Sequence, residues 1–61
     1  MLGFIRETWE KLNIIRRNAK LYAEVSNEDV QIYQYLENGK IMYNFEPVIQ
    51  TNKKVIETIK L

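Results

Sequence analysis

The sequence contains no cysteine and no histidine, and it has only one proline and two glycines among its 61 residues. Without cysteine no disulfide framework can form. Without either residue type, the usual ligands of zinc and iron–sulfur sites and the imidazole base are missing. The low glycine and proline contents exclude collagen-like and linker compositions. These absences lead us to expect no metal and no cofactor.

Catalytic groups are also scarce in this chain. Ser26 is the only serine, and no imidazole is available to activate it. The adjacent carboxylates of Glu28 and Asp29 precede a predicted strand and would point in different directions. The acidic residues do not have the spacing of a calcium-binding loop, and no glycine-rich phosphate loop is present. We therefore expect a protein that is not an enzyme.

The sequence gives little sign of membrane attachment. No apolar run approaches the roughly 20 residues that a helix needs to cross a bilayer. The first five residues reach Arg6 and Glu7 too early to form the hydrophobic region of a signal peptide. A helix with Trp9 beside cations could lie on a membrane surface, but Glu7 and Glu10 oppose this. We expect a cytoplasmic protein.

The residues that are present indicate one small globular domain spanning 1–61. Apolar residues make up 46% of the chain and aromatic residues 11%, and the net charge is only +1. A domain this short buries only about 60% of the surface that its unfolded chain exposes. Because no disulfide or metal can add stability, self-association is the most accessible remaining support. We therefore expect a homodimer or a complex with a partner protein.

Residues of about 4–24 are predicted to form a long amphipathic helix. At about 100° per residue, the apolar side chains of this segment collect on one arc and the charged ones on the other. No proline or glycine interrupts the segment. The apolar arc consists of Phe4, Ile5, Thr8, Leu12, Ile15, Ala19, Tyr22 and Ala23, with Trp9 at its edge.

Two apolar residues, Ile14 and Leu21, lie off this arc and flank the polar side. One interpretation is that a wide apolar face wraps further round a small core. The other is a second seam that contacts another chain, which the partial seven-residue repeats of the helix support weakly. We take Ile14 and Leu21 as candidate protein-interaction residues.

Charge is distributed unevenly and suggests an alternative function. Residues 1–24 and 48–61 each carry a net charge of +2, whereas residues 25–47 carry −3. A nucleic-acid-binding regulator would use the basic side of the helix and the basic pair near the C-terminus. The candidate contacts are Arg16, Arg17, Lys20, Lys53 and Lys54. Against this alternative, a net +1 with an acidic centre makes a poor surface for a polyanion.

A β-hairpin over about 30–46 is the clearest local prediction. Asn38-Gly39 suits the two positive φ angles of a type I′ turn, and Glu37 then lies opposite Lys40. A competing interpretation begins a helix at 26–29 and ends it at Gly39, but the β-branched and aromatic residues favour strands.

The alternation of side chains gives this hairpin one mainly apolar face and one mixed face. One face would cover the helix, with Gln34 as its one polar member. Its apolar members are Val30, Ile32, Leu36, Ile41, Tyr43 and Phe45. The other face carries Tyr33, Tyr35 and Met42, which are candidate protein-interaction residues because Tyr and Met are enriched in interface cores. Ordinary cross-strand packing or a second layer would explain the presence of these three side chains equally well. Stacking against nucleic-acid bases would explain it less well.

The C-terminal element has two interpretations after Pro47. Residues 48–59 have a helical stripe, whereas about 54–61 are rich in β-branched residues and follow a turn. We favour the strand, which would place Val55, Ile59 and Leu61 on the core face beside Glu57. The predicted fold is α+β, a long helix packed on an antiparallel hairpin or three-stranded meander, with α-β-β-α as the alternative. The predicted function is a small protein-interaction or regulatory protein.

Overall fold

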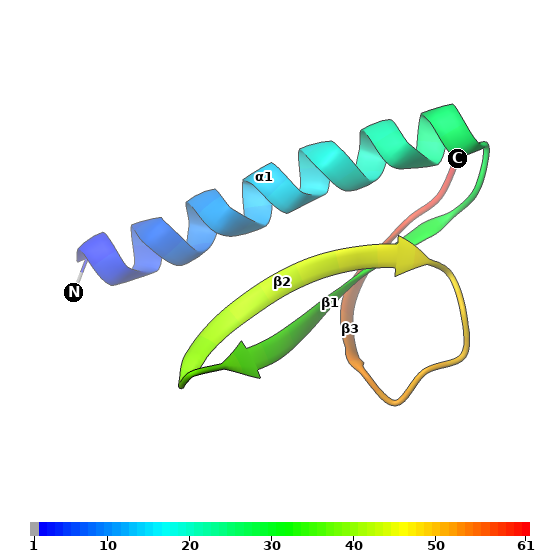
Figure 1. Cartoon of the computed structure of the whole chain (residues 1–61). Helices are drawn as coiled ribbons and strands as arrows, with labels where there is room; N and C mark the ends of the chain where they lie inside the picture. Colours follow the sequence, from blue (N-terminus) through cyan, green and yellow to red (C-terminus); the bar gives the residue numbers. More distant parts are fainter. Residues whose placement is uncertain (1) are drawn as a thin grey trace.

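The protein is an α+β domain in which one helix packs on one face of a three-stranded antiparallel sheet (Figure 1). The computed structural model describes the backbone of residues 2–61 and the side chains of 9–61. The elements are α1 Leu2–Ser26, β1 Val30–Glu37, β2 Lys40–Pro47 and β3 Lys54–Ile59. The predicted fold is confirmed, with the C-terminal element a strand. The predicted core contacts of Phe4, Ile5 and Thr8 lie outside the described side chains.

A left-handed residue ends α1. Asn27 has a φ of 56°, and the backbone N–H of Glu28 donates to the Ala23 carbonyl at 3.2 Å, which is typical of a helix C-cap. The chain then turns directly into β1, so the competing helix over 27–38 does not form. Asp29 connects this turn to two later segments, since its carbonyl accepts from Val48 and its carboxylate from Leu61.

The hairpin has the predicted turn and register. Asn38 and Gly39 have φ angles of 52° and 76°, as a type I′ turn requires. Glu37 pairs with Lys40, and the ladder continues outward through Ile32 opposite Phe45. The turn chemistry therefore determines which residues of the two strands share a face.

β3 lies beside β1, so the strand order is β2-β1-β3 rather than the sequential order of a simple meander. The connection over 48–53 crosses from the edge of β2 to the opposite side of β1 (Figure 1). β1 becomes the central strand, and its first three residues, Val30 to Ile32, are buried. Both sides of this short buried segment are thus protected by paired strands.

A bulge in β3 changes which of its side chains face the helix. Glu57 pairs with Ile32 but Val55 pairs with Tyr33, which leaves Ile56 without a cross-strand partner. Since paired residues share a face, Glu57 lies on the helix side and Val55 on the opposite side. The prediction that Val55 faces the core is therefore wrong. Leu61 follows the end of β3 and is exposed, so its predicted core position is also wrong.

Among residues 9–61, whose side chains are described, the buried core lies under the C-terminal half of α1. Its fully buried members are Ala19, Ala23, Val30 and Ile32. The two alanines permit a close approach of the helix to β1, and partly buried side chains surround this contact. They are Leu12, Ile15, Tyr43, Phe45 and Ile59. Tyr22 is partly exposed but packs against Phe45, with ring centroids 5.7 Å apart.

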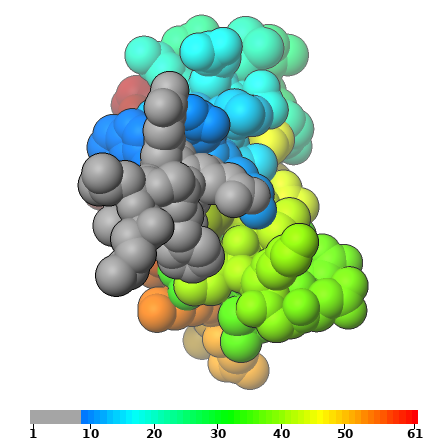
Figure 2. All heavy atoms as spheres, turned by 90° about the vertical axis from the view of Figure 1, so that its left-hand side faces the viewer, coloured from blue at the N-terminus to red at the C-terminus, as the bar shows by residue number. Residues whose placement is uncertain are grey.

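The tip of the hairpin does not belong to this core. Leu36 is 73% exposed and Ile41 is also exposed, although both were predicted to cover the helix. Figure 2 shows the tip (green) standing clear of the described part of α1. Paired strands twist, so a face that meets the helix near Ile32 has turned away from it by the pair of Leu36 and Ile41.

Candidate protein-interaction surfaces

The outward side of α1 carries a row of exposed aliphatic side chains. Ile14, Leu21 and Val25 are 57%, 60% and 79% exposed. Together with Asn18 they recur at spacings of four, three and four residues, which places them in one line along a helix. We call these four residues the helix stripe. The stripe faces away from the buried alanines of α1, so Ile14 and Leu21 are not part of the fully buried core.

Val25 extends this row but is not among the predicted interaction residues. The predicted helix stopped near residue 24, whereas α1 continues to Ser26. The signal was nevertheless present, because Val25 follows Leu21 by four residues and Ile14 by eleven. Contact of the helix stripe with another protein remains a prediction.

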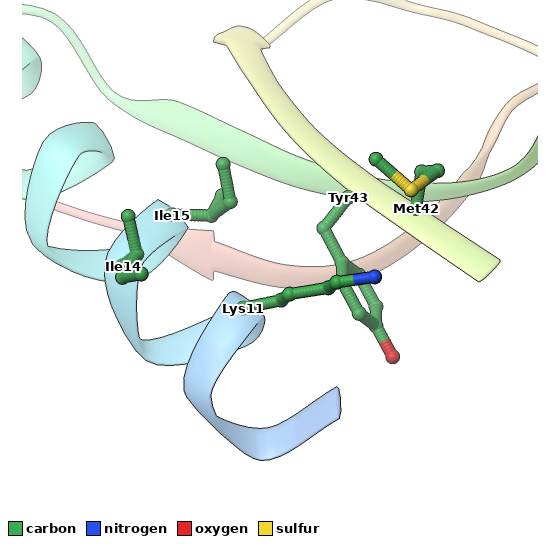
Figure 3. A pocket seen from close by; sticks show the side chains of 5 residues that line it. All are labelled: Lys11, Ile14, Ile15, Met42 and Tyr43. Atoms are coloured by element: carbon green, nitrogen blue, oxygen red, sulfur yellow. The ribbon is translucent and has the colours of Figure 1, made fainter. Parts of the chain in front are cut away.

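A shallow groove joins the helix stripe to the sheet. It encloses about 180 Å³ between α1 and β2 and is lined by Lys11, Ile14, Ile15, Met42 and Tyr43. Figure 3 shows Tyr43 extending from β2 beside Lys11, with Ile14 and Ile15 on the neighbouring turn of α1. Ile14 belongs to the helix stripe and also lines the groove. The apolar surface is therefore continuous from Met42 to the outward side of the helix.

The opposite face of the sheet is partly covered by the chain itself. The Gln31 side-chain amide donates to Glu46 Oε1 and to the Ile49 carbonyl, each at 3.2 Å, and Gln31 is only 4% exposed. Lys53 Nζ lies 4.4 Å from the centroid of the Tyr33 ring. Segment 48–53 thus lies against the sheet on the side away from α1.

The predicted residues of this face have different environments. Tyr33 is half-buried and Tyr35 is exposed, and their ring centroids are 5.8 Å apart. Met42 is half-buried in the groove beside α1. The three residues therefore do not form one open patch. The covering segment was missed because an isolated glutamine in a strand gives no sequence signal for a partner 18 residues later.

Acidification is expected to weaken the contact between Glu46 and Lys53. Their side chains lie 3.1 Å apart, and the hydrogen bond from Lys53 lowers the pKa of Glu46, while the same bond raises the pKa of Lys53. A lowered carboxyl pKa contributes stability above its unfolded-state value, and this stability is lost as the pH falls through the folded-state value. A raised lysine pKa contributes stability that is lost only at high pH.

The measurement is urea denaturation between pH 7 and pH 3, with a carboxyl-detected NMR titration of Glu46. We expect the free energy of unfolding of Glu46→Gln to fall less steeply over this range than that of the wild type. Glu37→Gln is the matched control, since Glu37 is exposed at the hairpin tip. If the free energy of unfolding falls equally steeply with pH in the wild type and in Glu46→Gln, the contact between Glu46 and Lys53 does not contribute to stability.

The five predicted nucleic-acid contacts do not form one surface. Arg16 binds Glu57, with Nη2 and Oε1 2.9 Å apart, and its guanidinium lies 5.8 Å from the Trp9 ring centroid. This ion pair also explains why the Glu57 carboxylate lies on the helix side of β3. Arg17 and Lys20 are exposed on α1, whereas Lys53 and Lys54 lie in the sheet layer at the start of β3.

The chain matches no protein-family model, no curated protein and no solved structure. Within the described residues, no helix combines the length and apolarity needed to cross a membrane. The same part of the chain contains no group of three or more acidic side chains arranged to hold a metal ion.

Proposed function

We propose that this chain is a small non-enzymatic protein-interaction or regulatory protein that binds a protein surface through the helix stripe. The observation that carries the proposal is the row of Ile14, Leu21 and Val25, each more than half exposed. An amphipathic surface helix normally has one apolar stripe, directed at its own core. The core of this domain uses the side of α1 that carries Ala19 and Ala23, so burial within a single chain does not account for this exposed row.

Association would bury apolar surface that the folded chain leaves in water. Fully burying an aliphatic side chain of this size contributes roughly 1.5–3 kcal/mol, and these three are already partly covered. Charges of both signs border the row, namely Arg17 and Glu24. Mixed charges suit a protein surface better than a membrane or a nucleic acid, each of which favours uniformly basic residues.

The test is a lysine substitution in the middle of the helix stripe. We expect Leu21→Lys to weaken association at least ~10-fold, because it places a charge in an apolar interface. Self-association is measured by light scattering, and binding of other proteins by quantitative capture from the cells that make this chain. Leu36→Lys is the control, since Leu36 is also more than half exposed but lies at the hairpin tip.

Two outcomes would contradict the proposal. One is association that Leu21→Lys leaves unchanged or that Leu36→Lys removes equally. The other is the absence of any protein association, combined with nucleic-acid retardation in a low-salt gel shift that Arg17→Ala and Lys20→Ala abolish. This second result would instead support the nucleic-acid-binding alternative.

A further inference from the structure

The helix stripe has the spacing of a seam between two helices. Its intervals of four, three and four residues are those of the a and d positions of paired helices, with Ile14 and Leu21 at d and Asn18 and Val25 at a. The row extends for about 16 Å along α1 at ~1.5 Å per residue. A helix laid on it would pack along the exposed side of α1, next to the groove between α1 and β2.

Two opposite charges border one edge of this seam. Arg17 and Glu24 precede Asn18 and Val25 by one residue, so both lie on the same side of the row. Both side chains are exposed. Neither forms an ion pair within the part of the chain whose side chains are described. Seven residues separate them, which is too far for contact with each other along one helix.

Resting on the proposed use of the helix stripe, we propose that its occupant is a second copy of this chain. The two α1 helices pair antiparallel about a two-fold axis. Ile14 of each copy then lies opposite Val25 of the other, and Asn18 lies opposite Leu21. The same surface is used by both copies, as a two-fold interface requires. The two sheets lie on the outer sides of the helix pair.

The bordering charges favour the antiparallel direction. In this register Arg17 of one copy lies within about 3 Å, measured along the axis, of Glu24 of the other copy. Side chains tilt toward the N-terminus of their own helix, so these two lean toward one another. Two-fold symmetry produces this ion pair twice. In a parallel pair aligned in register, Arg17 would instead lie beside Tyr22 of the second copy, and Glu24 would have no cation.

The interface is small and contains one polar residue, so the dimer is a weak one. Three aliphatic side chains from each copy cover less area than the roughly 1,200–2,000 Å² of a standard stable interface. Asn18 lowers affinity further but helps to fix the register. We expect a dissociation constant on the order of 10–100 μM. Asn18→Leu is expected to lower this constant at least ~10-fold.

Charge reversal tests both the occupant and the direction. In sedimentation equilibrium of the full chain, Arg17→Glu and Glu24→Arg should each weaken the homodimer at least ~10-fold. An equimolar mixture of these two variants should dimerise again, since each Arg17–Glu24 contact then pairs opposite charges. Far-UV circular dichroism and amide dispersion verify that each variant is folded. Lys20→Glu makes the same charge change as Arg17→Glu away from the seam and should alter the constant less than ~2-fold.

Disulfide cross-linking gives an independent test of the direction of the two helices, because the chain contains no cysteine of its own. Ile14→Cys and Val25→Cys chains of different mass are mixed and oxidised. The antiparallel pair yields mainly the mixed disulfide, since these positions lie opposite each other. A parallel pair yields the two homodimeric disulfides and would overturn the proposed direction, as would a mixture of charge variants that stays monomeric.

The failure of this inference can be distinguished from the failure of the proposed function. A wild-type chain that remains monomeric at 1 mM, about tenfold above the weakest constant expected, would overturn the second copy as occupant. If Leu21→Lys then still abolishes binding of a different protein, the interaction function of the helix stripe stands. If no association of any kind depends on Leu21, both fail.

Discussion

Ile32→Ala is expected to lower the free energy of unfolding by about 2–5 kcal/mol. Ile32 is fully buried near the start of β1, the central strand, between Phe45 of β2 and Glu57 of β3. Only four apolar residues of the described chain are fully buried. At about 0.05–0.15 kcal/mol per residue, a domain of this length has only about 3–9 kcal/mol of stability. The variant should therefore be partly or largely unfolded at 25 °C, as urea denaturation followed by circular dichroism would show.

The matched control is Leu36→Ala, on the same strand and the same face. Because Leu36 is largely exposed, its truncation should change the free energy of unfolding by less than about 0.5 kcal/mol. Ile32→Val removes a single methylene and should cost about 0.5–1.5 kcal/mol. Equal effects at Ile32 and Leu36 would mean that the core does not lie under the C-terminal half of α1.

Local patterns were sufficient to predict the helix, the hairpin and the hairpin register. The helical period of residues 4–24 and the positive φ angles favoured by Asn38-Gly39 act over a few residues. Once the turn is known, the pairing of Ile32 with Phe45 follows by counting. These features are determined within short segments, so a single sequence contains them in full.

The position of β3 depends on interactions that no local pattern records. Either edge of the hairpin accepts a strand, and the choice of β1 depends on how the segment over 48–53 crosses the sheet. The bulge at Ile56 is a second feature that no local pattern records, and it reverses the side on which Val55 lies. Leu36 was misplaced for a related reason, since alternation predicts the face of a strand but not where its twist leaves the helix.

The candidate surfaces were predictable to a different extent. Ile14 and Leu21 deviate from the core arc of the helix, so sequence periodicity alone identified them. Tyr33 and Met42 looked equally open, yet Lys53 lies over one and α1 borders the other. The residues that cover Tyr33 and Met42 are in both cases distant from them in sequence.

Gln31→Glu is expected to lower the free energy of unfolding by about 1–3 kcal/mol at pH 7. The substitution keeps the size of the side chain but removes both amide N–H donors, which bind Glu46 and the Ile49 carbonyl. It also places a second carboxylate opposite Glu46, the cross-strand partner of residue 31. Segment 48–53 should then separate from the sheet, and hydrogen exchange of its amides should accelerate.

Gln34→Glu provides the matched control on the same strand. Gln34 makes no side-chain hydrogen bond within the described residues, and it pairs with Lys54 across the sheet. An added carboxylate at 34 should therefore change stability by less than about 0.5 kcal/mol. At pH 3–4 the penalty of Gln31→Glu should shrink, because protonating either carboxylate removes the repulsion. If the penalty does not depend on pH, the loss comes from the hydrogen bonds alone. If Gln31→Glu and Gln34→Glu cost the same, Gln31 does not hold segment 48–53 against the sheet.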